Sequence, residues 1–148
     1  MSDVIVLDST PLGILAHPRN PPHAAACRTW LQSLLTAGRR VIVAEIADYE
    51  IRRSLMRLAS FQALANLDDL GRRLEYLSLS TPAMRLAADL WAQARNAGQP
   101  TAPDAALDGD VILAAQALTL GVPVMIATGN ASHLSRYVPA DEWQNIIP

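Results

Sequence analysis

Short candidate strands alternate along this chain with longer segments that have helical spacing. The candidates are Val4 to Leu7, Arg40 to Ala44 and Val122 to Ile126, with weaker ones at Leu74 to Leu79 and Trp143 to Ile147. Short apolar runs of this kind are typical of strands that are covered on both faces. Because parallel strands need long crossovers, the alternation predicts an α/β fold with a mainly parallel sheet and helices on both faces.

Proline and glycine residues mark the boundaries of the expected helices. Thr10 and Pro11 favour a helix start, and Gly38 favours a helix end. A loop is expected over residues 99–107, which contain two prolines. No internal repeat, low-complexity segment or linker is evident, so residues 1–148 are predicted to form a single domain. The expected helices span 11–16, 23–36, 45–60, 61–73, 80–97, 108–120 and 131–135.

The composition limits the choice of partners. Charged residues make up 18% of the 148 residues, below the usual quarter, which favours an apolar surface that meets another protein. The net charge is −2, so the chain lacks the overall positive field of many nucleic-acid-binding proteins. All 12 basic residues are Arg, whose planar group suits bidentate contacts with phosphate.

The sequence also indicates where the protein works. Its single cysteine, Cys27, lies in an apolar helical segment and is predicted to be a core residue, with no internal disulfide. No apolar run approaches the roughly 20 residues that cross a bilayer. The start of the chain enters a candidate strand at once, with no charge pattern of a signal peptide. We therefore expect a cytoplasmic protein with no membrane partner.

Acidic and polar residues recur where the candidate strands end. Asp8 ends the first strand, Asp110 opens a helix that is apolar on nearly all sides, and Asn130 follows another strand. Glu50 lies on the helix after the second strand. Ligand sites in parallel sheets lie outside the carboxyl ends of the strands. Carboxylates that meet there need a counter-charge, so the pattern predicts a divalent metal and chemistry on phosphate esters.

Each of these residues also has a purely structural explanation. Asp8 would cap the following helix, and Asp110 would complement a helix dipole. Glu50 would form a surface ion pair with Arg53, and Asn130 would be a turn residue. Spacing alone does not decide which acid of the helix faces the site, because Glu45 and Asp48 compete with Glu50.

Four neighbouring residues are candidates for supporting roles. The hydroxyl of Ser9 is placed to cap the helix or to hold a metal-bound water. Asp108 would serve as the helix N-cap and so free Asp110 for other work. Thr128 and Asn130, in the stretch Thr128-Gly129-Asn130, would orient a carboxylate or a bound water.

These positions together resemble the PIN domain, in particular the VapC-like toxins of type II toxin–antitoxin systems. The likeness covers almost the whole chain, from Val4 to about Tyr137, and it is carried by the order and spacing of four stretches. They are Val4-Ile5-Val6-Leu7-Asp8-Ser9, Glu45-Ile46-Ala47-Asp48-Tyr49-Glu50-Ile51-Arg52-Arg53, Asp108-Gly109-Asp110-Val111-Ile112-Leu113-Ala114-Ala115-Gln116-Ala117 and Thr128-Gly129-Asn130 with Leu134.

The resemblance implies a three-layer α/β/α sandwich around a mainly parallel sheet of four to five strands. It implies a ribonuclease that depends on Mg²⁺ or Mn²⁺, with Asp8, Glu50 and Asp110 as catalytic metal ligands and a metal-activated water. It further implies an RNA substrate, a cognate antitoxin and a homodimer. The possible RNA contacts are Arg52, Arg53 and Arg57, for which a salt bridge on the helix surface is the alternative.

The chain departs from the family pattern at two places. Ser9-Thr10 stands where Thr-Asn is common after the first aspartate, and His133 stands where a fourth acidic residue is common. Imidazole is a poor ligand for magnesium and a better one for manganese. A rival hypothesis is therefore a PIN-fold module that binds nucleic acid or protein with little or no nuclease activity. A phosphatase or another phosphoryl-transfer enzyme on a similar sheet is a third hypothesis.

Overall fold

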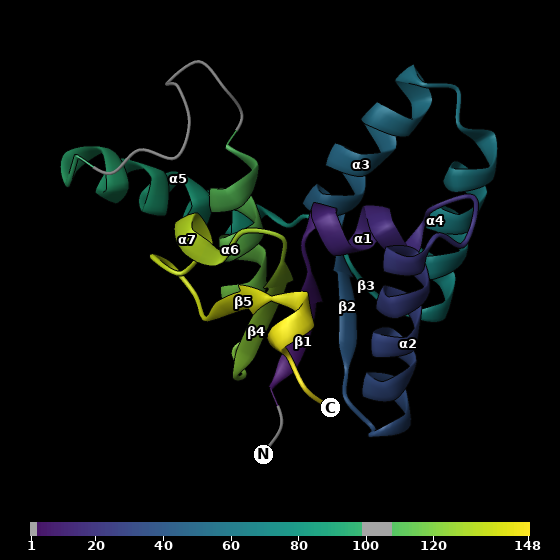
Figure 1. Cartoon of the computed structure of the whole chain (residues 1–148). Helices are drawn as coiled ribbons and strands as arrows, with labels where there is room; N and C mark the ends of the chain where they lie inside the picture. The colour runs from purple at the N-terminus through teal and green to yellow at the C-terminus, as the bar shows by residue number, and fades with distance from the viewer. Residues whose placement is uncertain (1–2, 99–107) are drawn as a thin grey trace.

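The computed structural model describes residues 3–98 and 108–148, and within them a five-stranded parallel sheet forms the centre of the molecule (Figure 1). The strand order is β3-β2-β1-β4-β5, and every neighbouring pair is parallel. This confirms the predicted α/β class. The strands are β1 (Val4–Leu7), β2 (Val41–Ala44), β3 (Glu75–Leu77), β4 (Val124–Thr128) and β5 (Ala140–Glu142).

Helices cover both faces of the sheet, as the resemblance implied. On one face, α1, α2 and α4 pack over Ile5 and Leu7, and on the other, α5, α6 and α7 pack over Val4 and Val6. Alternate residues of β1 thus enter opposite cores, which explains why this strand is apolar throughout. The helices are α1 (Ser9–Leu15), α2 (Pro22–Thr36), α3 (Glu45–Arg57), α4 (Phe61–Arg73), α5 (Thr81–Asn96), α6 (Gly109–Leu118) and α7 (Ala131–Leu134).

The central strand β1 positions the site. It pairs with β2 on one side and β4 on the other, with Leu7 opposite both Val43 and Ala127. The three strands therefore end at nearly the same level. Asp8 follows β1 directly, and its backbone N–H donates to the carbonyl of Ala127 at 2.9 Å.

Several predicted boundaries were wrong, among them the end of the helix expected to reach residue 120, which ends at Leu118. The strand expected at Val122 to Ile126 starts two residues later, so that Thr128 is its last residue. The helix expected to reach Ser60 ends at Arg57. Asp8, and not Thr10, is the N-cap of α1, because its side chain accepts a hydrogen bond from the N–H of Ser9.

The predicted C-terminal edge strand is also misplaced. The edge strand is β5, and Trp143–Asn145 forms a short 3-10 helix, η1. The ring of Trp143 packs against that of Trp30, with 5.5 Å between the centroids. Trp30 Nε1 also donates to the carbonyl of Ile146 at 2.8 Å. These contacts with α2 hold the segment against the core and away from the sheet edge. The loop expected over residues 99–107 lies outside the described residues.

The environment of Cys27 and the character of the helices can be compared with the sequence predictions. Cys27 is buried in the α2 core, as predicted, and burial raises the pKa of its thiol to about 12. Among the helices within residues 3–98 and 108–148, none has both the length and the apolar character that crossing a membrane requires.

The ends of α2 and α3 share one hydrogen-bond pattern but differ in one residue. At the end of α2, Gly38 has a φ of +79° and closes a Schellman motif. At the end of α3 the same position is Ala59, with a φ of +52°. The N–H of Ser60 donates to the carbonyl of Leu55 there, which completes the motif. An alanine in this conformation is strained by contact between its Cβ and the backbone.

This difference leads to a stability prediction. Ala59→Gly should raise the free energy of unfolding by up to about 1 kcal/mol, because glycine removes the Cβ strain at some entropic cost. Gly38→Ala, at the matched position, should lower it by about 1 kcal/mol. Urea unfolding of both variants measures these changes. A loss of stability in Ala59→Gly would contradict the strain argument.

Candidate active site

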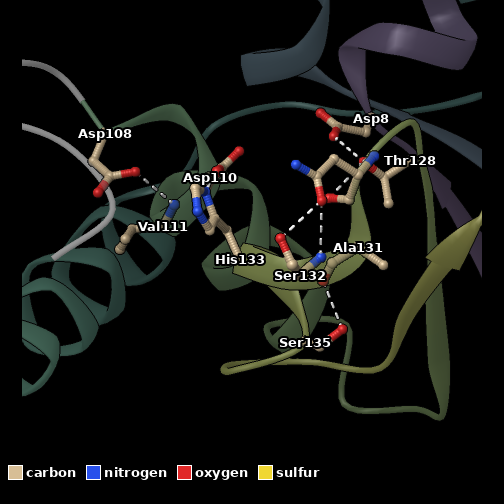
Figure 2. A network of polar contacts seen from close by, with 10 residues as sticks. Asp8, Asp108, Asp110, Val111, Thr128, Ala131, Ser132, His133 and Ser135 are labelled. Carbon is tan, nitrogen blue, oxygen red and sulfur yellow. Dashed lines mark hydrogen bonds and ion pairs between the residues drawn. The ribbon is translucent and has the colours of Figure 1, made fainter. Parts of the chain in front are cut away.

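Asp8 is the fixed point of the candidate site. It is buried, with 8% of its surface exposed, and both of its carboxylate oxygens are engaged. Oδ1 accepts from the N–H of Ser9 at 2.6 Å. Oδ2 accepts from Oγ1 of Thr128 at 2.7 Å (Figure 2). Asp8 therefore does cap α1, but a carboxylate has further lone pairs that remain open to a metal or a water.

The segment after β4 is held to the same point. Oγ1 of Thr128 accepts from the N–H of Asn130 at 3.1 Å, and Oδ1 of Asn130 caps α7 by accepting from the N–H of Ser132 at 3.2 Å. At Gly129, an added Cβ would lie 2.6 Å from Cγ2 of Thr10. This close approach requires glycine and lets the loop pass directly over the start of α1.

Glu50 reaches the site from α3. Its carboxylate lies against the start of α6, where a Cβ added to Gly109 would be 2.5 Å from Oε2 of Glu50. The glycine between Asp108 and Asp110 thus makes room for Glu50. The sequence showed this glycine between two acids, but the reason for it appears only when α3 and α6 are placed together.

The competing acids of α3 face elsewhere. Oε1 of Glu45 accepts from the N–H of Leu79 at 2.7 Å, beyond the end of β3. Asp48 is buried, where Arg52 and the hydroxyl of Tyr76 donate to its carboxylate at 2.8 and 2.7 Å. Of the three acids, Glu50 is therefore the one placed beside α6.

Asp108 and Asp110 stand on either side of Gly109 at the start of α6 but differ in role. Oδ1 of Asp108 accepts from the N–H of Val111 at 3.2 Å, which makes Asp108 the predicted N-cap (Figure 2). Asp110 keeps 37% of its side chain exposed, and its Oδ2 lies 3.7 Å from Nδ1 of His133. The carboxylate of Asp110 is thus not the cap of α6.

Burial and neighbouring negative charge both raise the pKa of two carboxyl groups at the site. Burial raises the pKa of Glu50, and the charges of Asp8 and Asp110 raise it further, while Arg53 lowers it. Burial also raises the pKa of Asp110, and Asp8 and Asp108 add to this, while His133 opposes it. Each shift means that the folded protein disfavours the ionised cluster unless a positive charge is present.

The donors therefore suit a hard divalent cation, which binds carboxylate and hydroxyl oxygens. In the side-chain positions of residues 3–98 and 108–148, no three His, Cys, Asp or Glu residues come close enough together to hold a metal ion. The chemistry of the cluster fits magnesium or manganese, and binding would require Asp8, Glu50 and Asp110 to approach one another further. Their role as ligands stays a prediction.

The three candidate arginines differ in how they are engaged. Arg52 pairs with Asp48 and Asp68, both at 2.8 Å, so it forms the salt bridges that were the alternative for this residue. Arg53 is exposed, and its guanidinium carbon lies 5.2 Å from the centroid of the Tyr49 ring. Arg57 is exposed in the last turn of α3. Arg52 thus links α3 to α4 through its two ion pairs, whereas Arg53 and Arg57 are exposed on the surface of α3.

A hollow of about 460 Å³ lies away from the carboxylates, between the end of α1, α2 and α4. Arg19, Arg28 and Arg73 line part of it, and none of the predicted catalytic acids does. Arg28 donates to the carbonyl of His17 at 2.7 Å and so holds the α1–α2 connection. The carboxylate cluster, and not this hollow, is the candidate for chemistry.

Comparisons with known proteins agree with this architecture. One solved structure that is similar is VapBC2 from Rickettsia felis, bound to a DNA fragment from its promoter, with a TM-score of 0.74 at 16% identity over 95% of this chain and 98% of that one. VapBC from Salmonella typhimurium, bound to DNA, gives a TM-score of 0.69 at 22% identity over 96% and 99%. FitAcB from Neisseria gonorrhoeae gives 0.66 at 17% identity over 97% and 100%. These likenesses establish a shared fold.

The PIN domain family model matches residues 5–136, most of the chain. The chain therefore belongs to the PIN domain family, which confirms the resemblance seen in the sequence. The search of curated proteins finds no match.

The hydrogen bond between Thr128 and Asp8 gives a testable prediction. Thr128→Val keeps the side-chain shape but removes the donor, so the free energy of unfolding should fall by about 1–3 kcal/mol. Thr119→Val is the matched control, because the Thr119 hydroxyl donates to the carbonyl of Gln116 at the exposed end of α6. Urea unfolding should show a smaller loss in the control. Equal losses in the two variants would argue against a special role for the Thr128 donor.

The raised pKa of Glu50 predicts a pH dependence. The unfolded chain ionises Glu50 at a lower pH than the folded protein does, so rising pH costs stability between the two pKa values. Without metal, Glu50→Gln should match the wild type below about pH 4 and be more stable at pH 7. Urea unfolding across this pH range in chelator measures the difference.

Glu75→Gln supplies a control of opposite sign. The Arg40 guanidinium lowers the pKa of Glu75, so its ionised form stabilises the fold. That variant should lose a little stability at pH 7 and none at low pH. Glu50→Gln being less stable than the wild type at pH 7 would contradict carboxylate crowding.

Proposed function

We propose that the protein is an endoribonuclease of the VapC-like toxin kind that depends on Mg²⁺ or Mn²⁺. Membership of the PIN domain family supports a nuclease at the level of the family. The observation that carries the proposal is the gathering of Asp8, Glu50 and Asp110 at the carboxyl ends of the central strands, where burial and the charges of Asp8 and Asp110 raise the pKa of Glu50. Such a cluster suits metal-assisted hydrolysis of a phosphodiester.

In this proposal each residue has a defined task. Asp8, Glu50 and Asp110 hold the ion, which when bound supplies a Lewis acid that activates water and offsets the charge on the scissile phosphate. Thr128 and the N–H of Ser9 fix the orientation of the Asp8 carboxylate. Asp108 holds the first turn of α6 so that Asp110 is directed to the site.

The α3 surface supports an RNA path next to this cluster. The positive charge of Arg53 lowers the pKa of Glu50, so a cation lies near the carboxylates. Arg57 is exposed on the same helix. We assign phosphate contacts to Arg53 and Arg57 rather than to Arg52, whose guanidinium is occupied by two aspartates.

A protein partner also belongs to the proposal. The similar solved structures include VapBC assemblies, which supports an antitoxin as a partner of this chain. Three large apolar side chains are exposed around the turn between α3 and α4: Met56 of α3 at 62%, Leu58 at 75% and Phe61 of α4 at 77%. Exposed apolar clusters of this kind favour contact with another protein, here a second copy of the chain or an antitoxin.

The second candidate is a PIN-fold binding module without nuclease activity. Two observations favour it: no three potential ligand side chains in the described ranges are positioned to hold an ion, and His133 stands beside Asp110 where a further acid is common in the family. The two candidates differ in their dependence on metal and on Asp110.

RNA cleavage tests the two candidates directly. A structured and an unstructured RNA are incubated with the protein in magnesium, in manganese and in chelator. Wild type should cleave only with metal, and Asp110→Asn should lose at least about 100-fold in rate because a metal ligand is missing. Asp89→Asn is the matched control, since Asp89 is exposed on α5 and bonds only to Gln93 among the contacts described.

Metal-independent cleavage, or equal cleavage by wild type and Asp110→Asn, would contradict the proposed mechanism. Binding of RNA without cleavage under any metal would instead support the binding module.

The proposed dimer has its own test. Light scattering of the purified chain should give twice the mass of one chain. Phe61→Ser should shift the protein toward the monomer if the α3–α4 turn lies in the interface, and Leu35→Ser on α2 is a control with a smaller exposed fraction, 37%. A wild-type monomer would count against the homodimer.

A further inference from the structure

His133 is held beside Asp110 by the folding of its own short segment. The preceding Asn130 caps α7, and the following Leu134 is buried in the core at 1% exposure. These two anchors fix the backbone on both sides of His133. Its side chain stays 47% exposed, and its Nδ1 lies 3.7 Å from Oδ2 of Asp110 (Figure 2).

The separation of the two atoms is informative. At 3.7 Å they are too far apart for a normal hydrogen bond, although a protonated imidazole would form an ion pair at this distance. Two donor atoms that bind one ion at about 2.1 Å each lie about 3 to 4 Å apart. The nitrogen of His133 and the oxygen of Asp110 are therefore spaced as two ligands of one ion would be.

We propose that His133 is a nitrogen ligand beside Asp110 in the metal site and that it biases this site toward manganese and against magnesium. The inference rests on the proposed function, because it takes the carboxylate cluster to be a metal site. It concerns this chain in particular, since a histidine stands here in place of an acid.

The selectivity follows from ligand chemistry. Magnesium binds oxygen donors almost exclusively and keeps much of its water, so exchanging an oxygen ligand for imidazole weakens it. Manganese accepts both imidazole and carboxylate. A neutral imidazole also adds no negative charge to a cluster in which the pKa of Glu50 and that of Asp110 are already raised.

Pulsed electron paramagnetic resonance of bound Mn²⁺ tests the nitrogen ligand directly, with no need for activity. Wild type should show a hyperfine coupling from a histidine nitrogen, and His133→Gln and His133→Asp should both lose it. His17→Gln is the matched control, because His17 lies on the α1–α2 connection, where its ring contacts that of His23. That variant should keep the coupling.

Calorimetric titration with Mg²⁺ and Mn²⁺ alone tests the selectivity. The ratio of the magnesium Kd to the manganese Kd should fall by about tenfold or more in His133→Asp, which restores an oxygen donor. An unchanged ratio would overturn the selectivity. Thermal unfolding of each variant confirms that the exposed substitution leaves the fold intact.

The outcomes separate this inference from the proposed function. Manganese that binds wild type and not Asp110→Asn, yet shows no nitrogen coupling, would overturn the role of His133 and leave the carboxylate site standing. Manganese binding no tighter in wild type than in Asp110→Asn would overturn both the inference and the metal dependence of the proposed function.

Discussion

The hydrogen bond from Thr128 to Asp8 joins the ends of two strands, and the rest of the site is built outward from it. The same hydroxyl accepts from the N–H of Asn130, and Asn130 caps α7. Helix α7 then brings His133 to Asp110 on α6. A series of local contacts thus links the end of β1 to the start of α6. Because the Thr128 hydroxyl contacts both Asp8 and the N–H of Asn130, we expect its loss to affect the position of Asp8 and of α7.

A second constraint comes from the other side of the site, where α3 meets α6. Gly109 has no side chain, and the Glu50 carboxylate lies so close that an added Cβ would be only 2.5 Å from its Oε2. This lets the carboxylate of Glu50 on α3 lie beside the start of α6, next to Asp110. Burial raises the pKa of Glu50 and of Asp110, and the charge of the neighbouring acids raises each pKa further, so repulsion is one part of the cost of that approach.

Much of this architecture could be predicted from the sequence because local signals and tertiary packing agree there. The run Val4 to Leu7 is apolar throughout since it faces two cores, and α4 begins and ends at the predicted residues. The C-terminal edge strand was misplaced because contacts with Trp30 decide the path of that segment. Such a contact joins residues more than a hundred positions apart and leaves no local pattern.

The candidate site, like the fold, could be predicted only where local sequence signals were sufficient. Asp8 and Asp110 could be found because each stands at the end of an apolar element. The sequence could not choose Glu50 over Asp48, since the choice depends on partners from other elements. Tyr76 of β3 donates to Asp48, as does Arg52, which also reaches Asp68 of α4. These contacts turn Asp48 toward β3 and α4, while Glu50 faces the start of α6.

The burial of Cys27 has a practical consequence for studying this chain. Its thiol is the only one in the sequence, and with a pKa raised to about 12 it stays protonated and shielded at neutral pH. A cysteine introduced at an exposed position would therefore be the only residue to react with a thiol-specific spin label or fluorophore. Distances between labelled helices could then be followed as a metal or partner binds, with the native core left intact.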